Sequence, residues 1–170
     1  MTGYKRLFID YGRCIGCENC ASVCRFLRNA DGMYMVRTKE GLTAPIYCRH
    51  CKKPACIKAC PYGSLTKDPL GAVIQNKLIC AGCETIDCFA ACPFGAIFCT
   101  GKAVPVTKCD LCVRRRADGL EPACAEMCPT GAIRLVRHED VADLRSEESI
   151  AARKRLVCHI NPSPERRAGI

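Results

Sequence analysis

The chain has 170 residues, a formal charge of +9 and 18 cysteines, with no tryptophan and only five phenylalanines and five tyrosines. Bulky apolar side chains are too few for a large hydrocarbon core, so something other than side-chain packing must hold the fold. The first residues lack the apolar run of a secretory signal, and no window approaches about 18 apolar residues. We therefore expect a cytoplasmic protein with no direct membrane span, in which dense cysteine indicates metal binding.

Four cysteine groups recur along the chain and leave only Cys99 and Cys158 outside them. Two or four residues separate neighbouring cysteines within most groups, eleven separate the middle pair of the last group, and every group ends in Cys-x3-Cys. In chain order the groups are Cys14, Cys17, Cys20 and Cys24; Cys48, Cys51, Cys56 and Cys60; Cys80, Cys83, Cys88 and Cys92; and Cys109, Cys112, Cys124 and Cys128.

Short β-prone runs lie between the groups, and we expect them to form hairpin strands. In chain order these runs are residues 6–10, 33–38, 72–80, 96–109 and 132–136, with Gly71 and Gly101 near turns. The cysteine-rich stretches themselves should be loops that run into short helices. Three groups end in similar phrases, CPYGSL, CPFGAI and CPTGAI. Their Pro and Gly predict a turn that leaves a ligand and enters a strand.

The composition changes after about residue 137. Residues 138–170 contain no cysteine group, and only Cys158, an exposed thiol or a ligand, lies among them. Ser146 is a candidate helix cap, because acidic Glu147 and Glu148 follow it and the basic residues 153–155 come next. Acid at the start of a helix and base at its end suit the helix dipole. We therefore expect a partly helical tail that contacts a partner or a second copy.

The cysteine spacings are typical of iron–sulfur clusters. A Cys-x2-Cys pair lets one turn present two thiolates, and another cysteine adds a third corner of a cubane. In bacterial two-cluster ferredoxins the fourth cysteine of the C-x2-C-x2-C-x3-C-P run ligates the other cluster. One group cannot then complete its own site, so four groups imply four [4Fe–4S] clusters in partnered sets. Structural zinc is the alternative, but zinc sites have no reason for the Cys-Pro-x-Gly endings.

The negative charge of the clusters explains the excess of basic residues. The formal value of +9 counts every thiol as neutral. Four oxidised cubanes with thiolate ligands would carry about −2 each, which brings the chain to about +1. We therefore expect no nucleic-acid partner.

The order of the groups and the phrases CVRRRADGLEPAC, YCRHCKKPAC and KCDLC resemble one known family. This family comprises the four-cluster ferredoxin-like electron-transfer subunits of anaerobic molybdenum or tungsten oxidoreductases, formate and carbon monoxide dehydrogenases and some hydrogenases. The resemblance covers about residues 6–137. It implies that the first group pairs with the fourth and the second with the third. The implied ligand sets are Cys14, Cys17, Cys20 and Cys128; Cys109, Cys112, Cys124 and Cys24; Cys48, Cys51, Cys56 and Cys92; and Cys80, Cys83, Cys88 and Cys60.

The same resemblance implies an α+β fold of two bacterial-ferredoxin-like modules packed around four iron–sulfur clusters. One module is inserted in the other: residues 1–40 and 100–137 form the outer module, residues 41–99 the inner module, and residues 138–170 the tail. Arg25 follows Cys24 where a simple ferredoxin would have Pro. The resembled subunits often lack Pro at this first group, so this difference is mild.

The implied function is electron transfer without catalysis, because the chain has no phosphate-binding loop and no paired acid and base in a plausible pocket. Electrons would pass between a catalytic tungsten or molybdenum pterin subunit that oxidises aldehyde or formate and a flavin subunit, ferredoxin or hydrogenase. Two alternatives stay open. The chain could serve a carbon monoxide dehydrogenase or hydrogenase, or it could be a polymerising scaffold whose copies self-associate through the tail.

Residues outside the ligand sets have competing interpretations. We interpret His50 as a partly exposed packing residue, with donation of an N–H to a cluster sulfur as the alternative. The basic run 114–116 could dock an acidic partner or form a solvated loop. Cys99 is expected to be a small buried residue in a strand. Tyr62 and Phe94 are expected to shield clusters from water.

Overall fold

The computed structural model describes residues 4–37, 43–101 and 104–152. Within these ranges the strands pair as two-stranded antiparallel sheets. The pairs are β1 (Lys5–Ile9) with β8 (Ile133–Arg137), β2 (Met33–Arg37) with β3 (Thr43–Tyr47), β4 (Leu65–Lys67) with β5 (Val73–Gln75), and β6 (Ile97–Cys99) with β7 (Val106–Lys108). Together with short helices, they give the mixed helix and strand content that the sequence predicts.

Short helices follow or carry the cysteine groups, as expected. They are α1 (Asn19–Arg28), α2 (Ala55–Ala59), α3 (Lys77–Cys80), α4 (Asp87–Ala90), α5 (Val113–Ala117) and α6 (Ala123–Glu126), followed by a 3₁₀ turn, η1 (Glu139–Val141). The third cysteine of each group lies on α1, α2, α4 or α6. None of the helices in the described ranges is long and apolar enough to cross a membrane.

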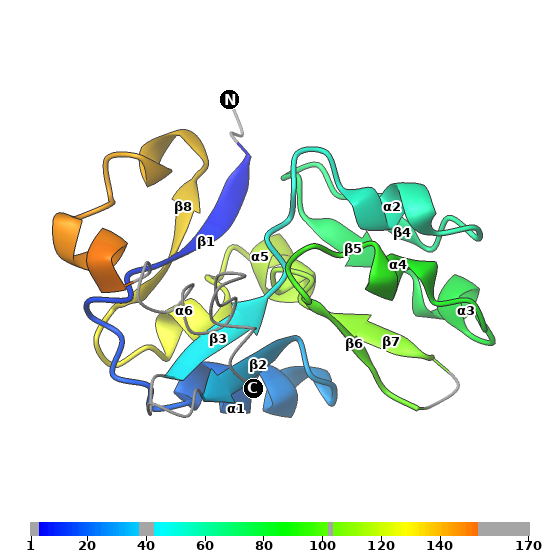
Figure 1. The fold of residues 1–170 in the computed structure, drawn as a ribbon, viewed down its shortest axis with the longest axis horizontal. Coiled ribbons are helices and arrows are strands. Elements are labelled where there is room, and N and C mark those ends of the chain that lie inside the picture. Colours follow the sequence, from blue (N-terminus) through cyan, green and yellow to red (C-terminus); the bar gives the residue numbers. More distant parts are fainter. Residues whose placement is uncertain (1–3, 38–42, 102–103, 153–170) are drawn as a thin grey trace, which may run out of the picture.

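The elements of the first and fourth groups lie together, and so do those of the second and third. β1 pairs with β8, from Lys5 opposite Arg137 to Ile9 opposite Ile133. Helix α1 contacts α6, and α2 contacts α4. In Figure 1 the elements α2 to α4 and β4 to β7 fill one half of the molecule, β1, β8, α1 and α6 fill the other, and α5 lies between them.

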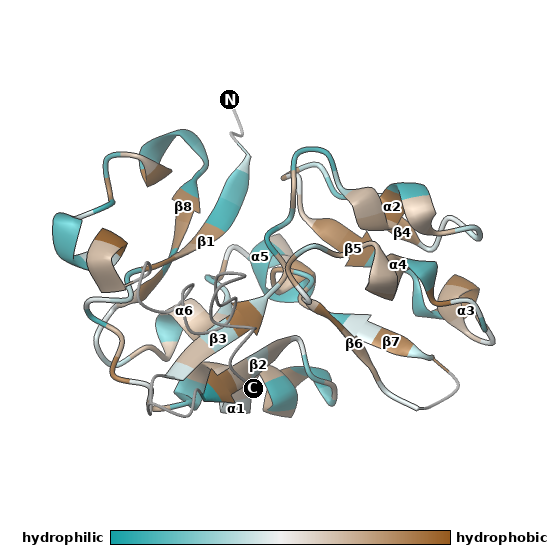
Figure 2. Ribbon diagram, in the orientation of Figure 1, coloured by the Kyte–Doolittle hydropathy of each residue, from teal (hydrophilic) through white to brown (hydrophobic). Residues whose placement is uncertain are grey.

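The core is small and consists partly of cysteine. In one half Leu7, Met33 and Leu111 are buried in a cluster with Cys20, Cys24 and Cys124. In the other half, buried residues of β4 to β7 pack with cysteines of the second and third groups, and Figure 2 shows the apolar residues of β5 in brown. The thin apolar core matches the expectation from composition.

One of the predicted strand runs is interrupted. The run 72–80 is a strand only over β5, and residues from Lys77 to Cys80 form α3 instead. The reason is local: the Asn76 side chain accepts the backbone N–H groups of Leu78 and Ile79 and so caps a helix. The run 96–109 forms the hairpin β6–β7, with Gly101 between the two strands, as predicted.

The start of the tail agrees with the sequence. A helix begins at residue 147, and the Ser146 hydroxyl accepts the backbone N–H of Ser149 at 3.1 Å, which is a cap bond. Residues 153–155 and Cys158, to which the sequence also assigned roles, lie outside the described residues.

Candidate metal centres

A tight turn follows the last cysteine of three groups. The backbone N–H of the turn glycine donates to the carbonyl of the cysteine three residues earlier, at 3.3 Å for Gly63, 3.2 Å for Gly95 and 3.1 Å for Gly131. These glycines have φ angles of 64°, 56° and 61°, which other residues adopt only under strain. Each turn leads after one residue into β4, β6 or β8. The Cys-Pro-x-Gly phrase is therefore a turn between a ligand and a strand, as predicted.

These turns aim hydrogen-bond donors at the cysteine sulfur. The Ala96 N–H donates to Cys92 Sγ at 3.4 Å, and the Ser64 hydroxyl lies 3.3 Å from Cys60 Sγ. Burial acts to raise the pKa of Cys60, but Ser64 and backbone N–H groups of the turn outweigh it and lower that pKa. The pKa of Cys128 is lowered in the same way, against burial, by N–H groups of its own turn. The turns thus favour the thiolate, the form that binds metal.

The first group holds its last cysteine differently. Helix α1 continues through Cys24 to Arg28, because Arg25 follows where the other groups have Pro. Burial raises the pKa of Cys24, while the Arg28 guanidinium and the Gly32 N–H oppose that rise. A Cβ at Gly32 would lie 2.8 Å from Cys24 Sγ, so only glycine leaves room there. Gly32 was not predicted as a functional residue, because the sequence marks it only by its place before a β-prone run.

In the half built from the first and fourth groups, cysteines of both groups line one cavity. Its walls include Leu7, Met33 and Pro122, and the cysteines that line it are Cys24, Cys109, Cys112 and Cys124. Burial raises the pKa of Cys124 well above its usual value, and thiolates at the other three positions raise it further. Cys24 thus lines one cavity with three cysteines of the fourth group.

The remaining cysteines of this half surround Cys20. Burial raises the pKa of Cys20 to about 11, and the negative charges of Cys14 and Cys17 raise it further. Cys128 packs against the buried cluster that contains Cys20. The structure therefore places the first three cysteines of the first group together and brings Cys128 to the same core.

In the other half, cysteines of the second and third groups lie near one another. Burial raises the pKa of Cys88 to about 11, and the charges of Cys60, Cys80, Cys56 and Cys83 raise it further, in that order. The pKa of Cys51 and that of Cys56 are likewise raised by burial first, with further contributions from Cys48 and Cys92. The last cysteine of each group thus lies near cysteines of the other group.

The donor chemistry of these neighbourhoods fits iron–sulfur clusters. Each neighbourhood gathers cysteine sulfur, and soft thiolates are the ligands that such clusters use. The cysteines of the described ranges are all free, so none is committed to a disulfide. No three Cys, His, Asp or Glu side chains in those ranges converge closely enough to hold a single metal ion. A cubane is larger than one ion and spaces its ligands more widely.

Comparisons with known proteins agree with this chemistry. The model of the 4Fe-4S dicluster domain matches residues 39–138, and that of the 4Fe-4S binding domain matches residues 7–26. The chain belongs to the 4Fe-4S dicluster family. The match decides for iron–sulfur over zinc, and it confirms the family that the cysteine spacing resembles.

Several relatives of this chain carry informative names. Probable anaerobic dimethyl sulfoxide reductase chain YnfG of Escherichia coli (strain K12) is 30% identical over 89% of this chain and 81% of its own length. Formate dehydrogenase-O iron-sulfur subunit of the same strain is 33% identical over 82% of this chain, and a tetrathionate reductase subunit of Salmonella typhimurium (strain LT2) is 34% identical over 74%. The chain spans about half the length of these last two, 55% of each.

His50 is buried, which corrects the expectation of a partly exposed residue. Its ring is 1% exposed, and Nδ1 accepts the Val73 N–H at 2.9 Å. Nε2 then carries the proton of the neutral ring and has no hydrogen-bond partner among the described residues. Burial lowers the pKa of His50 well below its usual value, and the charge of Lys108 lowers it further. Because the Nε2–H of His50 has no protein partner in the described residues, it agrees with the alternative that His50 donates to a cluster sulfur.

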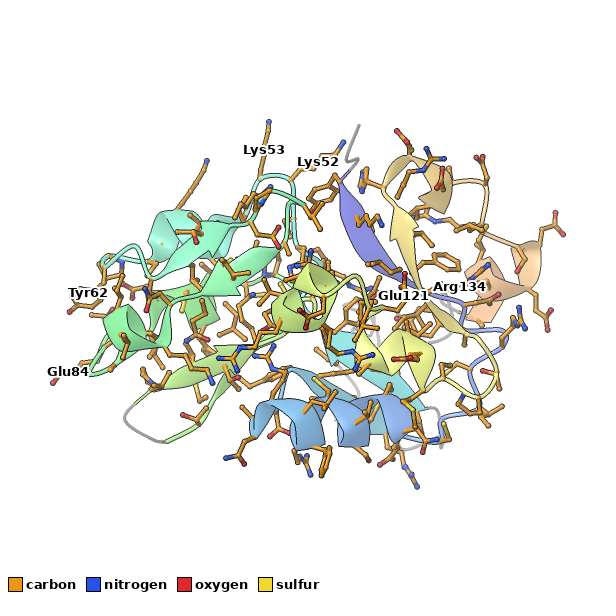
Figure 3. The ribbon with its side chains drawn as sticks, turned by 180° about the vertical axis from the view of Figure 1, so that it is seen from behind. Lys52, Lys53, Tyr62, Glu84, Glu121 and Arg134 are labelled. Atoms are coloured by element: carbon orange, nitrogen blue, oxygen red, sulfur yellow. The ribbon has the colours of Figure 1, made fainter. Side chains whose placement is uncertain are left out.

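The expectations for Cys99 and for the two aromatic residues are also revised. Cys99 is exposed on β6, so its prediction as a buried residue is wrong. Cys99 shares a face of β6 with buried Ile97, but it is the last residue of the strand and lies at the exposed end of the hairpin. Tyr62 and Phe94 are 55% and 47% exposed, and Figure 3 shows Tyr62 at the outer end of its half. These rings therefore lie at the surface beside their turns, where their shielding of clusters stays a prediction.

The basic run 114–116 belongs to helix α5 and not to a loop. Arg116 pairs with Asp68 at 2.6 Å, and both side chains are buried, 4% and 7% exposed. This ion pair joins α5 to the turn between β4 and β5. Arg115 pairs with Glu126 nearer the surface. Arg116 therefore has a structural role and is not free to dock a partner.

Proposed function

We propose that this chain is an electron-transfer subunit, without catalysis of its own, that relays single electrons through four [4Fe–4S] clusters. The observation that carries this proposal is the cavity lined by Cys24 together with Cys109, Cys112 and Cys124, because it takes ligands from two cysteine groups. Exchange of the last cysteine is the hallmark of paired ferredoxin clusters. Four groups that exchange ligands in this way support four clusters.

The proposed ligand sets are those that the resemblance implies. Set I comprises Cys14, Cys17, Cys20 and Cys128; set II comprises Cys109, Cys112, Cys124 and Cys24; set III comprises Cys48, Cys51, Cys56 and Cys92; and set IV comprises Cys80, Cys83, Cys88 and Cys60. The pairing of β1 with β8 and the contact of α1 with α6 support an outer module of residues 1–40 and 100–137. The contact of α2 with α4 supports an inserted inner module of residues 41–99. Two strand pairs join the modules, because β7 pairs with β6 and β3 pairs with β2.

The electrostatic neighbours of the cysteines support a linear order of these sets. The charge of Cys20 in set I acts on Cys124 in set II. That of Cys48 in set III acts on Cys109 in set II, and that of Cys56 in set III acts on Cys88 in set IV. An electron would then pass in the order I, II, III, IV or the reverse. Bound clusters supply the one-electron chemistry, while the chain spaces them, excludes water and directs N–H groups at their sulfurs.

The proposed partner is a catalytic molybdenum or tungsten pterin subunit. The relatives are named as chains or subunits of dimethyl sulfoxide reductase, tetrathionate reductase and formate dehydrogenase, which are multi-subunit oxidoreductases. A flavin subunit, a ferredoxin or a hydrogenase would be the second redox partner. We place the complex in the cytoplasm, where thiols stay reduced until clusters are inserted.

The test is purification of the tagged chain from its native cell under anoxic conditions, with metals quantified in the complex. Iron at about sixteen atoms per chain, four for each of four clusters, is expected beyond the partner's share, together with stoichiometric molybdenum or tungsten. Nickel instead would move the partner to a carbon monoxide dehydrogenase or hydrogenase. Zinc in place of iron would contradict the electron-transfer function.

A further inference from the structure

The two halves of the molecule meet where Cys48 and Cys109 are buried together. Both cysteines belong to one small core cluster with Ala96, and they are 8% and 6% exposed. After burial, the negative charge of Cys48 is the largest influence that raises the pKa of Cys109. On the proposed function, these residues belong to sets III and II. An electron that crosses between the modules must therefore pass this junction.

A buried cation lies at this junction. Lys108, at the end of β7, is 1% exposed and is the largest of the fully buried side chains. Its Nζ donates to the carbonyl of Cys109 at 2.6 Å and to the carbonyl of Val73 on β5. The ammonium is thus fixed between the strand of one half and a ligand of the other, with no freedom to reach solvent.

Two arginines of the same region have carboxylate partners. Arg116 pairs with Asp68, and Arg28 pairs with Asp110. Within the described ranges no carboxylate forms an ion pair with Lys108. Its neighbour His50 cannot compensate it, because that ring is neutral or cationic. A buried ammonium without a counter-charge is costly, so negative charge must come from elsewhere in its surroundings.

The cysteines of sets II and III are the available source of that charge. Lys108 Nζ contacts the carbonyl of Cys109, a ligand of set II, and the carbonyl of Val73. The N–H of Val73 donates to His50 Nδ1, which lies 3.8 Å from the Sγ of Cys48, a ligand of set III. One ammonium therefore acts on a ligand of each set.

We propose that Lys108 is a positioning residue for electron transfer, a fixed positive charge that raises the reduction potentials of the two middle clusters, those of sets II and III. Lys108 carries no electron itself. An electron that enters either set adds one negative charge, and a cation in a medium of low dielectric constant stabilises that charge strongly. The junction between modules thereby becomes the part of the relay that is reduced most readily.

The experiment is an anoxic redox titration of the full iron-loaded chain, followed by EPR, with Lys108→Gln. Glutamine keeps a hydrogen-bond donor and removes the charge. Two of the four midpoint potentials should shift to lower values while the other two stay as in the unmodified chain. Lys108→Arg retains the charge and should restore both. The matched control is Lys53→Gln, because Lys53 is exposed and close in sequence to Cys51, and Figure 3 shows it projecting from the surface.

Each outcome separates this inference from the proposed function. If the unmodified chain binds no iron–sulfur cluster, the proposed function fails before Lys108 is tested. Four clusters whose potentials do not move in Lys108→Gln, or move as much in Lys53→Gln, would overturn the role of Lys108 alone. If Lys108→Gln assembles poorly, loss confined to two clusters supports a charge shared by sets II and III. Loss of all four clusters would instead mark Lys108 as a general folding residue and overturn the proposal.

Discussion

The last cysteine of the first group lies inside a helix, whereas the last cysteines of the other three groups lie in turns. Cys24 is buried within α1, and its sulfur depends on Arg28 and on the N–H of Gly32 beyond the helix. Cys60 and Cys128 lie just past short helices, and N–H groups of their own turns lower their pKa values.

This difference shows two ways to prepare a metal-binding thiol. A Cys-Pro-x-Gly turn does so locally, because its glycine takes a positive φ angle and directs the following N–H groups at the sulfur. The continued helix cannot do so, because its own N–H groups are committed to the helix ladder. Cys24 must instead accept a hydrogen bond from the Gly32 N–H, and it is buried by the segments of the fourth group that pack beside α1.

The largest expected effects come from the last cysteines themselves. In Cys24→Ser the cluster of set II should be lost, and set I, its neighbour, should be damaged, while the inner pair is kept. In Cys60→Ser the loss should fall on the inner pair, because set IV loses a ligand. Iron content and EPR of the anoxic chain measure both. Cys99→Ser is the control, because this cysteine is exposed and outside the groups, and it should keep all the iron.

An equal loss of all four clusters in Cys24→Ser and Cys60→Ser would contradict the pairing of the groups.

The next effect tests whether the first group needs its helix. Arg25→Pro would give this group the Cys-Pro sequence of the others but without their glycine. Proline inside α1 removes a helix hydrogen bond and clashes with the preceding turn, so a loss of about 3 kcal/mol in stability is expected. Arg25→Gln removes only the exposed ion pair with Asp31 and should leave the stability nearly unchanged.

Thermal unfolding of both iron-loaded variants under anoxic conditions measures this difference. Equal melting temperatures for Arg25→Pro and Arg25→Gln would mean that the helix does not hold Cys24.

Glycine substitutions should separate the two kinds of ligand support. At Gly32 the added methyl meets Cys24 Sγ, so Gly32→Ala should cost about 1–3 kcal/mol by overpacking and alter the EPR signal of set II. At Gly63 nothing lies within 4 Å of an added methyl, but φ is positive. Gly63→Ala should therefore cost roughly 1–2 kcal/mol through backbone strain alone.

Unfolding temperatures and EPR spectra of Gly32→Ala and Gly63→Ala are compared under the same conditions. A Gly32→Ala variant with an unchanged spectrum would indicate that Gly32 does not support the Cys24 sulfur.

The smallest expected effect concerns a single hydroxyl. In Ser64→Ala the donor beside Cys60 Sγ is lost, so the pKa of that thiol should rise and the potential of set IV should become slightly lower. The loss of one hydrogen bond should cost about 1 kcal/mol. Redox titration measures the potential, with Thr66→Ala as a control because Thr66 is exposed on β4. A potential of set IV that is unchanged, or that moves equally in both variants, would remove Ser64 from the support of this ligand.

Much of the site could be predicted from the sequence because its geometry is local. The turns after Cys60, Cys92 and Cys128 follow from Pro and Gly at fixed offsets, since a turn of four residues closes its own hydrogen bond. The cap at Ser146 is equally local. The family follows from the cysteine spacing, because thiolates on one loop and a fourth on the next helix are what a cubane requires.

Only the tertiary structure decided which side chains are buried and which cysteines are neighbours. His50 is buried and Cys99 exposed, contrary to expectation, because burial depends on strands from distant parts of the chain. Nothing in the sequence marked Lys108 as a buried cation, since its carbonyl partner on Val73 lies 35 residues away. Hydrogen bonds within a turn are encoded by neighbouring residues, whereas charge and burial at a junction arise only when the two halves pack together.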